Sequence, residues 1–445
     1  MEAHLFLISI IYFIFSIIAF GNEARIIKYS RVISMVDICK LMYLLLNVVI
    51  PLIIYLGYVF GGITSSSIRY SNDQIYAFYM GALYTILGYV CFSFGCKIKQ
   101  RTYYQHEYTT NAKLLVSSTI FLVISVVSLI IWASGFGGVS QLILKANSIR
   151  AGFITGSNNR AFFKHFVQVS MISSLTAFYY LFLSKDTDRS LIKKIYAFLL
   201  FILSTIITIL YIVANDGRML AGIFIMMFLL LIIKVQYEEN KASLSGITIK
   251  LLIISVITII LIFNADTILA IFRGGITSTV AQRTGVVEKI TNEFSFIITG
   301  LSTSISQEHL LTFGNDLING IFAWLPTSLK PIILQDVWDY NTHLLNTGVY
   351  GQSPTSIVAQ SIYDLDMIGI VIIPTVYGFV VKKIQNIADR YQDVFFKVIY
   401  ILLGFYLGKG MAYFSVYNIM MNTFFVFFAC IVYFFVNKTT IGSSK

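Results

Sequence analysis

The chain has 445 residues, of which 57% are hydrophobic and only 12% are charged, and its formal net charge is +11. Soluble domains carry about 25% charged residues, so a chain with a mean hydropathy of +0.80 cannot cover a soluble surface. A soluble enzyme, a secreted domain and a disordered chain are excluded. Apolar stretches of about 20 residues recur, which predicts an all-α polytopic membrane protein, because barrel strands would alternate apolar and polar residues.

Eleven membrane spans are predicted in chain order. They lie at 4–20, 41–60, 75–95, 114–134, 166–184, 195–214, 219–236, 250–270, 367–381, 397–413 and 417–436. The first run is predicted to be a span and not a signal peptide, because it lacks a basic stretch before it and a small-residue cleavage site after it. The spans are nearly free of charge, with Asp266 as the main exception. We expect a single membrane domain, 1–445, with a large loop, 271–366, between the eighth and ninth spans.

The cysteines lie in or next to apolar segments, and no CxxC motif or Cys/His cluster occurs among Cys39, Cys91, Cys96 and Cys430. Neither a disulfide framework nor a structural zinc site is therefore expected.

Basic residues alternate between the two sets of connections. One set holds 21 of the 32 lysines and arginines with its flanking residues, whereas the other set holds 11. The richer set is 21–40, 96–113, 185–194, 237–249, 382–396 and the C-terminal tail. The positive-inside rule places this set in the cytoplasm. The N-terminus and the 271–366 loop are then expected outside, and the C-terminus inside.

The outer connections favour arginine. The cytoplasmic set has 5 Arg and 16 Lys, whereas the outer set has 6 Arg and 5 Lys. Lysine is enough to set topology, whereas arginine binds phosphate or carboxylate through a planar, permanently charged fork. Chance together with ordinary ion pairs is the competing explanation. The outer arginines are Arg69, Arg150, Arg160, Arg218, Arg273 and Arg283.

Two outer elements combine arginines with polar turns. The segment 135–165 has apolar residues at helical spacing, which predicts an interfacial amphipathic helix: Val139, Leu142, Ile143, Ala146 and Ile149. Arg150 and Arg160 flank its flexible GFITGSNN turn, an arrangement that suits an anionic head group, with interfacial snorkelling as the alternative. The turn 215–218, Asn-Asp-Gly-Arg, is costly between two apolar spans unless it faces water or a ligand. Neutralisation of Arg218 by Asp216 is its alternative explanation.

The 271–366 connection is too long to be structureless unless it is functional. Its residues 286–298 predict an amphipathic helix that lies on the membrane and covers a cavity, with simple packing against the spans as the alternative. The apolar face comprises Val286, Val287, Ile290, Phe294, Ile297 and Ile298. Further along, aromatic residues are expected to anchor at the interface, where they could also stack on sugars: Trp324, Trp338 and Tyr340.

This connection also contains the titratable candidates for acid/base chemistry. They are Glu293, Glu308, His309, Asp316, Asp336, Asp339, His343 and Asp364. Their spacing is not specific to one chemistry, and adjacent residues such as Glu308 and His309 cannot share a helix face. A solvated surface role is the alternative for each of them.

The layout from about 110 to 436 resembles the O-antigen polymerases of the Wzy type and the related O-antigen ligases. The stretch NDGRML (215–220) is similar to the small-polar-Arg element at the outer end of a span in that family. The stretch GQSPTSIVAQSIYDLDMIGIVIIPTVYG (351–378) is similar to the return from the large loop, where a Ser-rich helix and an acidic turn precede an apolar run. The ligases usually carry a His-Asn pair before this return, whereas this chain has Thr342-His343-Leu344, which argues against a ligase.

The resemblance implies a GT-C-like, metal-independent glycosyltransferase that needs no cofactor. It implies that a growing chain is transferred from undecaprenyl diphosphate to a new lipid-linked unit. Outer arginines would then bind the diphosphate leaving group: Arg150, Arg160, Arg218, Arg273 and Arg283. A general base is sought near the membrane surface in the large loop, where Glu293, His309 and His343 are the first candidates. Glu308, Asp316 and Asp364 come next.

The expected partners are undecaprenyl-diphosphate-linked oligosaccharides, membrane lipids and a chain-length regulator protein, but no nucleic acid. The expected location is the bacterial inner membrane, and the expected pathway is lipopolysaccharide biosynthesis. Two alternatives stay open: an O-antigen ligase or other lipid-linked sugar transferase, and a flippase or transporter of lipid-linked oligosaccharides.

Overall fold

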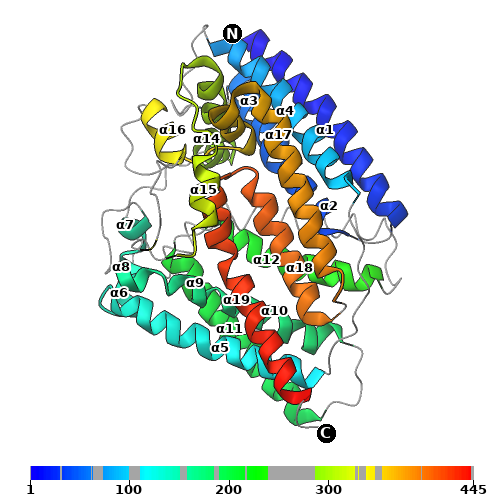
Figure 1. The fold of residues 1–445 in the computed structure, drawn as a ribbon, viewed down its shortest axis with the longest axis vertical. Coiled ribbons are helices and arrows are strands. Elements are labelled where there is room, and N and C mark those ends of the chain that lie inside the picture. The colour runs from blue at the N-terminus through cyan, green and yellow to red at the C-terminus, as the bar shows by residue number, and fades with distance from the viewer. Residues whose placement is uncertain are drawn as a thin grey trace. The chain divides into compact units, whose positions relative to one another are not determined.

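The computed structural model describes residues 2–30, 33–61, 63, 74–99, 111–150, 158–184, 190–215, 218–238, 286–325, 329, 337–345, 353–391 and 393–441. In these ranges all regular elements are helices (Figure 1). Eight of them are long and apolar enough to cross a membrane. The prediction of an all-α polytopic membrane protein is therefore confirmed.

The eight helices coincide with eight of the predicted spans. They are Glu2–Ile27, Met35–Val59, Ile75–Lys97, Lys113–Ser134, Lys164–Leu183, Leu191–Ala214, Ile357–Ala388 and Val416–Val436. The predicted span 219–236 forms a shorter apolar helix, Leu220–Gln236. The predicted span 397–413 falls on α18 (Val394–Gly410), which has 17 residues. The predicted span 250–270 lies outside the described residues.

The chain divides into two compact units. Unit 1 comprises Met1–Thr102, Thr279–Ile387 and Gly404–Asn422, and unit 2 comprises Tyr103–Ser278, Ala388–Leu403 and Thr423–Lys445. Each unit thus combines segments that are far apart in the sequence.

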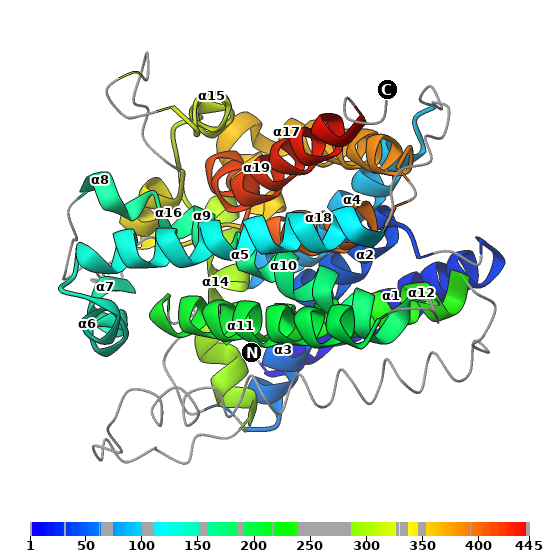
Figure 2. The same ribbon diagram turned by 90° about the horizontal axis from the view of Figure 1, so that it is seen from below.

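In unit 1, three helices lie side by side and a fourth crosses them. The three are α1 (Glu2–Ser30), α3 (Ile50–Val59) and α4 (Ile75–Lys97). The fourth is α14 (Val286–Ser306), which packs on α3 and α4 and is seen lengthwise in Figure 2 but nearly end-on in Figure 1. The amphipathic helix predicted at 286–298 is therefore present and longer than expected. The cavity beneath it measures about 10 Å³, room for about one water, so α14 packs directly on its neighbours.

One long helix of unit 1 contains an internal π-helical turn. It starts at α2 (Met35–Leu44), where Ser34 and Asp37 form a capping box. It then passes through a π-helical turn, Leu45–Val49, into α3. Pro51 explains the turn, because proline has no N–H to donate to the preceding helical turn.

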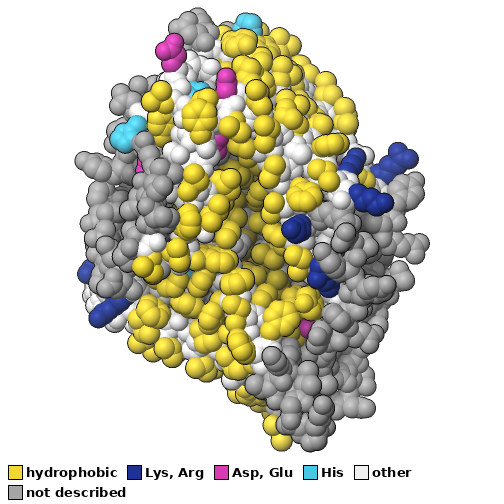
Figure 3. Space-filling model, in the orientation of Figure 1, with side chains coloured by type: hydrophobic (Ala, Val, Ile, Leu, Met, Phe, Trp, Pro, Cys, Tyr) yellow, Lys and Arg dark blue, Asp and Glu magenta, His cyan; other side chains and the backbone are white. Residues whose placement is uncertain are grey.

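Unit 1 also contains α17 (Ile357–Ala388), whose exposed face is apolar. Ile368, Ile372, Val376 and Val380 recur every four residues and are all exposed. Figure 3 shows hydrophobic side chains covering this face. Such a stripe is suited to contact with lipid.

The opposite face of α17 meets α4 through glycines. A Cβ on Gly95 would overlap the carbonyl oxygen of Thr375, and a Cβ on Gly378 would overlap that of Phe92. The Sγ of Cys96 also donates to the carbonyl of Gly378 at 3.4 Å. Small residues of this kind let membrane helices approach backbone to backbone.

We therefore expect Gly95→Ala and Gly378→Ala each to destabilise the protein by about 1–3 kcal/mol, as overpacking does elsewhere. The measurement is thermal unfolding in one detergent. Gly21→Ala is the matched control, because a Cβ at Gly21 in α1 meets nothing within 4 Å. The control should be neutral or slightly more stable, since alanine favours helices. Equal stability of the Gly95 variant and the control would contradict the close contact.

In unit 2, hydroxyl groups join the helices α5 (Asn111–Ser134), α10 (Val169–Phe178) and α11 (Leu191–Ala214). Ser118 and Thr176 join α5 to α10 with a 2.6 Å hydrogen bond, and Ser170 and Thr208 join α10 to α11 at 2.8 Å. Buried hydroxyl pairs hold membrane helices together in this way. They set α10 between two neighbours in the interior of unit 2.

Candidate functional site

The helix α17 is broken at Leu365 and Asp366, where φ is −139° and +55°. A Cβ on Gly369 would overlap the carbonyl oxygen of Ser361, although these residues would be about 12 Å apart along a straight helix. The chain therefore folds back sharply at this point, which we call the α17 break. The break coincides with the acidic turn that the sequence places before an apolar run. We call Ile357–Asp364 the entry segment.

The entry segment begins level with the middle of α4. A Cβ on Gly88, near the centre of α4, would meet the side chain of Val358 at 2.9 Å. Beyond the break, Met367 lies closer to the start of α4, where its sulfur accepts a 3.3 Å hydrogen bond from the hydroxyl of Tyr84. The entry segment thus runs back toward the start of α4 before the long part of α17 reverses direction.

Two non-helical segments are paired at this level. Ile357 N donates to the carbonyl of Met411 at 2.9 Å, and Phe414 N donates to that of Thr355 at 2.7 Å. One segment precedes the entry segment, and the other joins α18 to α19 (Val416–Ile441). Within a membrane, unwound backbone is tolerated only where protein or a water-filled cavity satisfies its polar groups. Here each segment provides partners for the other.

A buried carboxylate fastens the entry segment to the chain that follows α14. The Oδ1 of Asp364 accepts hydrogen bonds from Thr312 Oγ1 at 2.5 Å and from Gly314 N at 3.2 Å. Its Oδ2 accepts one from Gln360 Nε2 at 3.1 Å. Asp364 is 4% exposed, and both of its oxygens are already engaged. This geometry gives it a structural role.

His309 lies against the same entry segment. Its Nε2 is 3.4 Å from the carbonyl oxygen of Ile362, and its ring meets that of Tyr363 edge to face, with centroids 5.0 Å apart. The Tyr363 hydroxyl donates to Asn341 Oδ1 at 2.8 Å. Its other ring nitrogen, Nδ1, is 3.0 Å from the carbonyl oxygen of Gln307. His309 is partly exposed, so the imidazole is held between two carbonyl groups and remains accessible from one side.

The other two acid/base candidates are also in unit 1 but have different surroundings. Glu293 is partly exposed in α14, and His343 is exposed in α16 (Val337–Leu345). The two helices pack together, and a Cβ on Gly300 would lie 3.4 Å from Asn341. Of the three candidates, His309 is the one whose contacts with the entry segment are described above.

The remaining titratable candidates of the 271–366 connection differ in how deeply their side chains are buried. Asp316 is 1% exposed and accepts hydrogen bonds from Ser415 Oγ at 2.9 Å and Val416 N at 2.5 Å, so it caps the start of α19. Glu308 is exposed, and Asp336 lies outside the described residues. The indole N–H groups of Trp324 and Trp338 donate to carbonyls of Met420 and Phe414 at 2.9 and 2.8 Å. These indoles are therefore fixed to backbone near the start of α19.

The arginines predicted to bind diphosphate fall mainly in unit 2. Arg150 ends α7 (Ala146–Arg150), and Arg218 begins α12 (Arg218–Glu238). Arg160, in α8 (Asn158–Ala161), is exposed, and its Nη1 donates to Ser134 Oγ at 3.1 Å. Arg273 and Arg283 lie outside the described residues. The three described positions lie at the end of unit 2 where α5 and α11 end.

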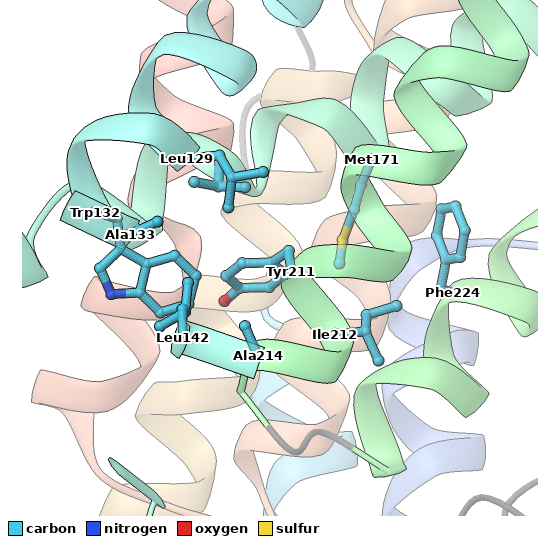
Figure 4. Packing of buried hydrophobic residues seen from close by; sticks show 10 residues of the cluster. Leu129, Trp132, Ala133, Leu142, Met171, Tyr211, Ile212, Ala214 and Phe224 are labelled. Atoms are coloured by element: carbon cyan, nitrogen blue, oxygen red, sulfur yellow. The ribbon is translucent and has the colours of Figure 1, made fainter. Parts of the chain in front are cut away.

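A hydrophobic cluster underlies this end of unit 2. Trp132 and Leu129 of α5 face Tyr211 of α11, with the Trp132 and Tyr211 ring centroids 6.1 Å apart (Figure 4). The amphipathic helix predicted in 135–165 forms two short helices, α6 (Val139–Leu144) and α7, rather than one. The predicted face is nevertheless correct in part, because Leu142 is fully buried in the cluster.

Three charged side chains within helices were not among the predicted site residues. Lys40 Nζ binds Glu23 at 3.0 Å, and both side chains are buried between α1 and α2. Lys409, in the last turn of α18, has its Nζ 5.2 Å from the centre of the Tyr413 ring, beside the paired non-helical segments. The signal in the sequence was an ionisable residue inside the predicted span 397–413. Asp266, the main charge within the predicted spans, lies outside the described residues.

Comparison of the chain with protein-family models, with curated proteins and with solved structures gives no match. The resemblance to O-antigen polymerases thus rests on the sequence features alone.

Proposed function

We propose that the protein is a metal-independent membrane glycosyltransferase that polymerises oligosaccharide units linked to undecaprenyl diphosphate. The observation that carries the proposal is the position of His309 against the entry segment, which follows directly on one of the two paired non-helical segments. Broken helices of this kind form substrate sites in other membrane proteins. The described part of the 271–366 connection packs as helices within unit 1.

In the proposed reaction, an acceptor hydroxyl oxygen attacks the anomeric carbon of the lipid-linked donor. A new glycosidic C–O bond forms, the bond from the anomeric carbon to the diphosphate oxygen breaks, and the diphosphate leaves with the bonding electrons. His309 is the proposed base that takes the hydroxyl proton. Outer arginines would stabilise the charge that develops on the leaving diphosphate. We propose the periplasmic face of the bacterial inner membrane as the location.

Lys409 is a further cation suited to this proposal. It extends from the last helical turn before one of the unwound segments and contacts the ring of Tyr413. An ammonium at this level would be costly in lipid, so such residues usually face a cavity or a partner. We infer that it contributes to binding of the anionic head group.

The proposed function is tested with purified full-length protein in lipid nanodiscs supplied with lipid-linked oligosaccharide extracted from the source cells. We expect a ladder of products with increasing numbers of repeat units. A flippase would instead move the lipid across liposomes without changing its length. A ligase would transfer units only when a second acceptor is added. If folded protein that binds the lipid-linked oligosaccharide makes no longer products, the polymerase proposal is wrong.

The arginine role predicts that charge alone is not sufficient at position 218. Arg218→Lys keeps the charge but loses the planar fork, so we expect chain growth to fall by about 10²–10³-fold, as for loss of one charged hydrogen bond at a transition state. The measurement is polymer length in cells with matched protein levels. Arg390→Lys is the control, because the predicted topology puts Arg390 on the cytoplasmic side. Near-normal polymer from Arg218→Ala would remove Arg218 from the site.

A further inference from the structure

Two buried side chains at the start of α10 have polar atoms without a partner. His165 is 5% exposed and Gln168 is 3% exposed, and neither His165 Nδ1 nor Gln168 Oε1 has a hydrogen-bond partner. Buried polar atoms are almost always paired. Residues three apart share a helix face, so both unpaired atoms belong to one side of the chain. This coincidence indicates that a partner from outside the chain is missing.

The surroundings of these two residues are largely aromatic. The amide of Gln168 donates from Nε2 to the hydroxyl of Tyr211, which belongs to the cluster of Figure 4. The ring of Phe162 lies 5.8 Å from that of His165. Binding sites for small molecules combine apolar and aromatic walls with a few polar groups in this way.

The chemistry of the unpaired atoms selects the ligand. A phosphate oxygen at neutral pH only accepts hydrogen bonds, so it cannot satisfy a carbonyl oxygen. The amide of Gln168 can also be turned over and His165 has two tautomers, so the orphan atoms can be donors or acceptors. A hydroxyl group both donates and accepts, and it therefore matches every one of these arrangements. A hydroxyl-bearing ligand or a bound water therefore fits the unpaired atoms, whereas a bare phosphate does not.

Cations lie next to these residues in sequence and in structure. Lys164 precedes His165 in α9 (Lys164–Val167), and the exposed Arg160 belongs to the preceding helix, α8. Both are at the end of unit 2 where α5 and α11 end. A hydroxylated ligand with an attached anionic group fits this combination better than a neutral one.

We propose that His165 and Gln168 form a sugar subsite for the lipid-linked substrate, with Arg160 and Lys164 binding the adjacent phosphate. The subsite rests on the proposed function, because that function provides a sugar joined directly to a diphosphate. His165 and Gln168 bind hydroxyl groups of the sugar, and the neighbouring aromatic rings exclude water around it. Neither residue takes part in bond formation.

The test compares two probes on the full-length protein in nanodiscs. One probe is lipid-linked oligosaccharide extracted from the source cells, and the other is the same polyprenyl diphosphate without sugar. We expect the wild type to bind the sugar-bearing lipid at least about tenfold more tightly, equivalent to 1.4 kcal/mol. His165→Phe and Gln168→Met should abolish this preference and keep the affinity for the bare diphosphate.

Thermal stability provides a second readout that a purely structural role would not produce. His165→Phe removes an unpaired buried polar atom and keeps an aromatic ring, so the ligand-free protein should be as stable as the wild type or more stable. Thr176→Val is the matched control. It removes a buried hydroxyl whose partner is Ser118, so it should lower stability and leave the preference between the probes unchanged.

The outcomes separate the subsite from the proposed function. If the variants keep the wild-type preference and still polymerise, the subsite is wrong and the polymerase stands. If the variants keep the wild-type preference and His165→Phe is less stable than the wild type, the subsite is likewise wrong and the missing partner is a bound water only. If the variants lose the preference but no preparation elongates chains, the sugar subsite stands and the polymerase falls. Binding of neither probe by the wild type overturns both.

Discussion

Replacement of His309 by alanine is expected to stop chain growth, with a loss of about 10²–10⁴-fold, the range that general acid–base groups contribute. His309 is held by Tyr363 and the carbonyl of Ile362 at the entry segment, so its position is fixed by α17. The measurement is the rate of repeat-unit addition by purified protein, together with the amount of unconsumed lipid-linked substrate.

The histidine of α16 provides the matched control. His343 is exposed, so His343→Ala should keep nearly the wild-type rate. His309→Gln separates proton transfer from positioning, because glutamine can still donate to the Ile362 carbonyl but cannot take a proton. If His309→Gln elongates chains at the normal rate, the proton goes elsewhere. Glu293 is then the next group to test, and the leaving diphosphate follows it.

The second large effect is expected at the buried ion pair of unit 1. Lys40 Nζ lies 3.0 and 3.3 Å from the two carboxylate oxygens of Glu23, and Tyr89 donates to the same carboxylate at 2.8 Å. Lys40→Met would leave the carboxylate buried without its counter-ion. Loss of one partner of a buried pair costs about 3–5 kcal/mol, so we expect strong destabilisation in detergent unfolding experiments.

The double variant shows whether the pair itself is needed. Glu23→Gln in the Lys40→Met background removes the stranded charge, so most of the lost stability should return. Lys383→Met is the control, because Lys383 is exposed on α17 and surface changes usually stay within about 0.5 kcal/mol. Equal stability of Lys40→Met and Lys383→Met would show that the carboxylate is protonated or hydrated in the folded protein.

The positions of the helices were readable from the sequence, because a membrane-spanning helix must be apolar over about 20 residues. The predicted span 75–95 and the observed α4 differ by two residues at one end. The amphipathic pattern at 286–298 likewise predicted α14, since helical periodicity is a local property. The 21–40 segment was assigned to a connection, although α1 continues to Ser30 and α2 begins at Met35. The capping box of Ser34 and Asp37 was the local signal for that second boundary.

The candidate site was only partly readable. His309 was one of several titratable residues without specific spacing, and nothing local distinguished it from His343. The distinction comes from Tyr363, which lies far along the chain and packs against His309. The unpaired atoms of His165 and Gln168 were likewise invisible, because only packing shows whether a polar atom has a partner.

The sequence by itself determined that the protein is a helical membrane protein, where most of its helices lie and which titratable residues fall in the late connection. These properties follow from composition and from hydrophobic periodicity, and both can be read from stretches of a few helical turns. Only the tertiary structure decided that α17 folds back at Asp366, that Thr355 pairs with Phe414, and that His309 meets the entry segment. Each of these depends on contacts between residues that are distant in sequence or on a close backbone approach at Gly369, and hydropathy contains no information about either.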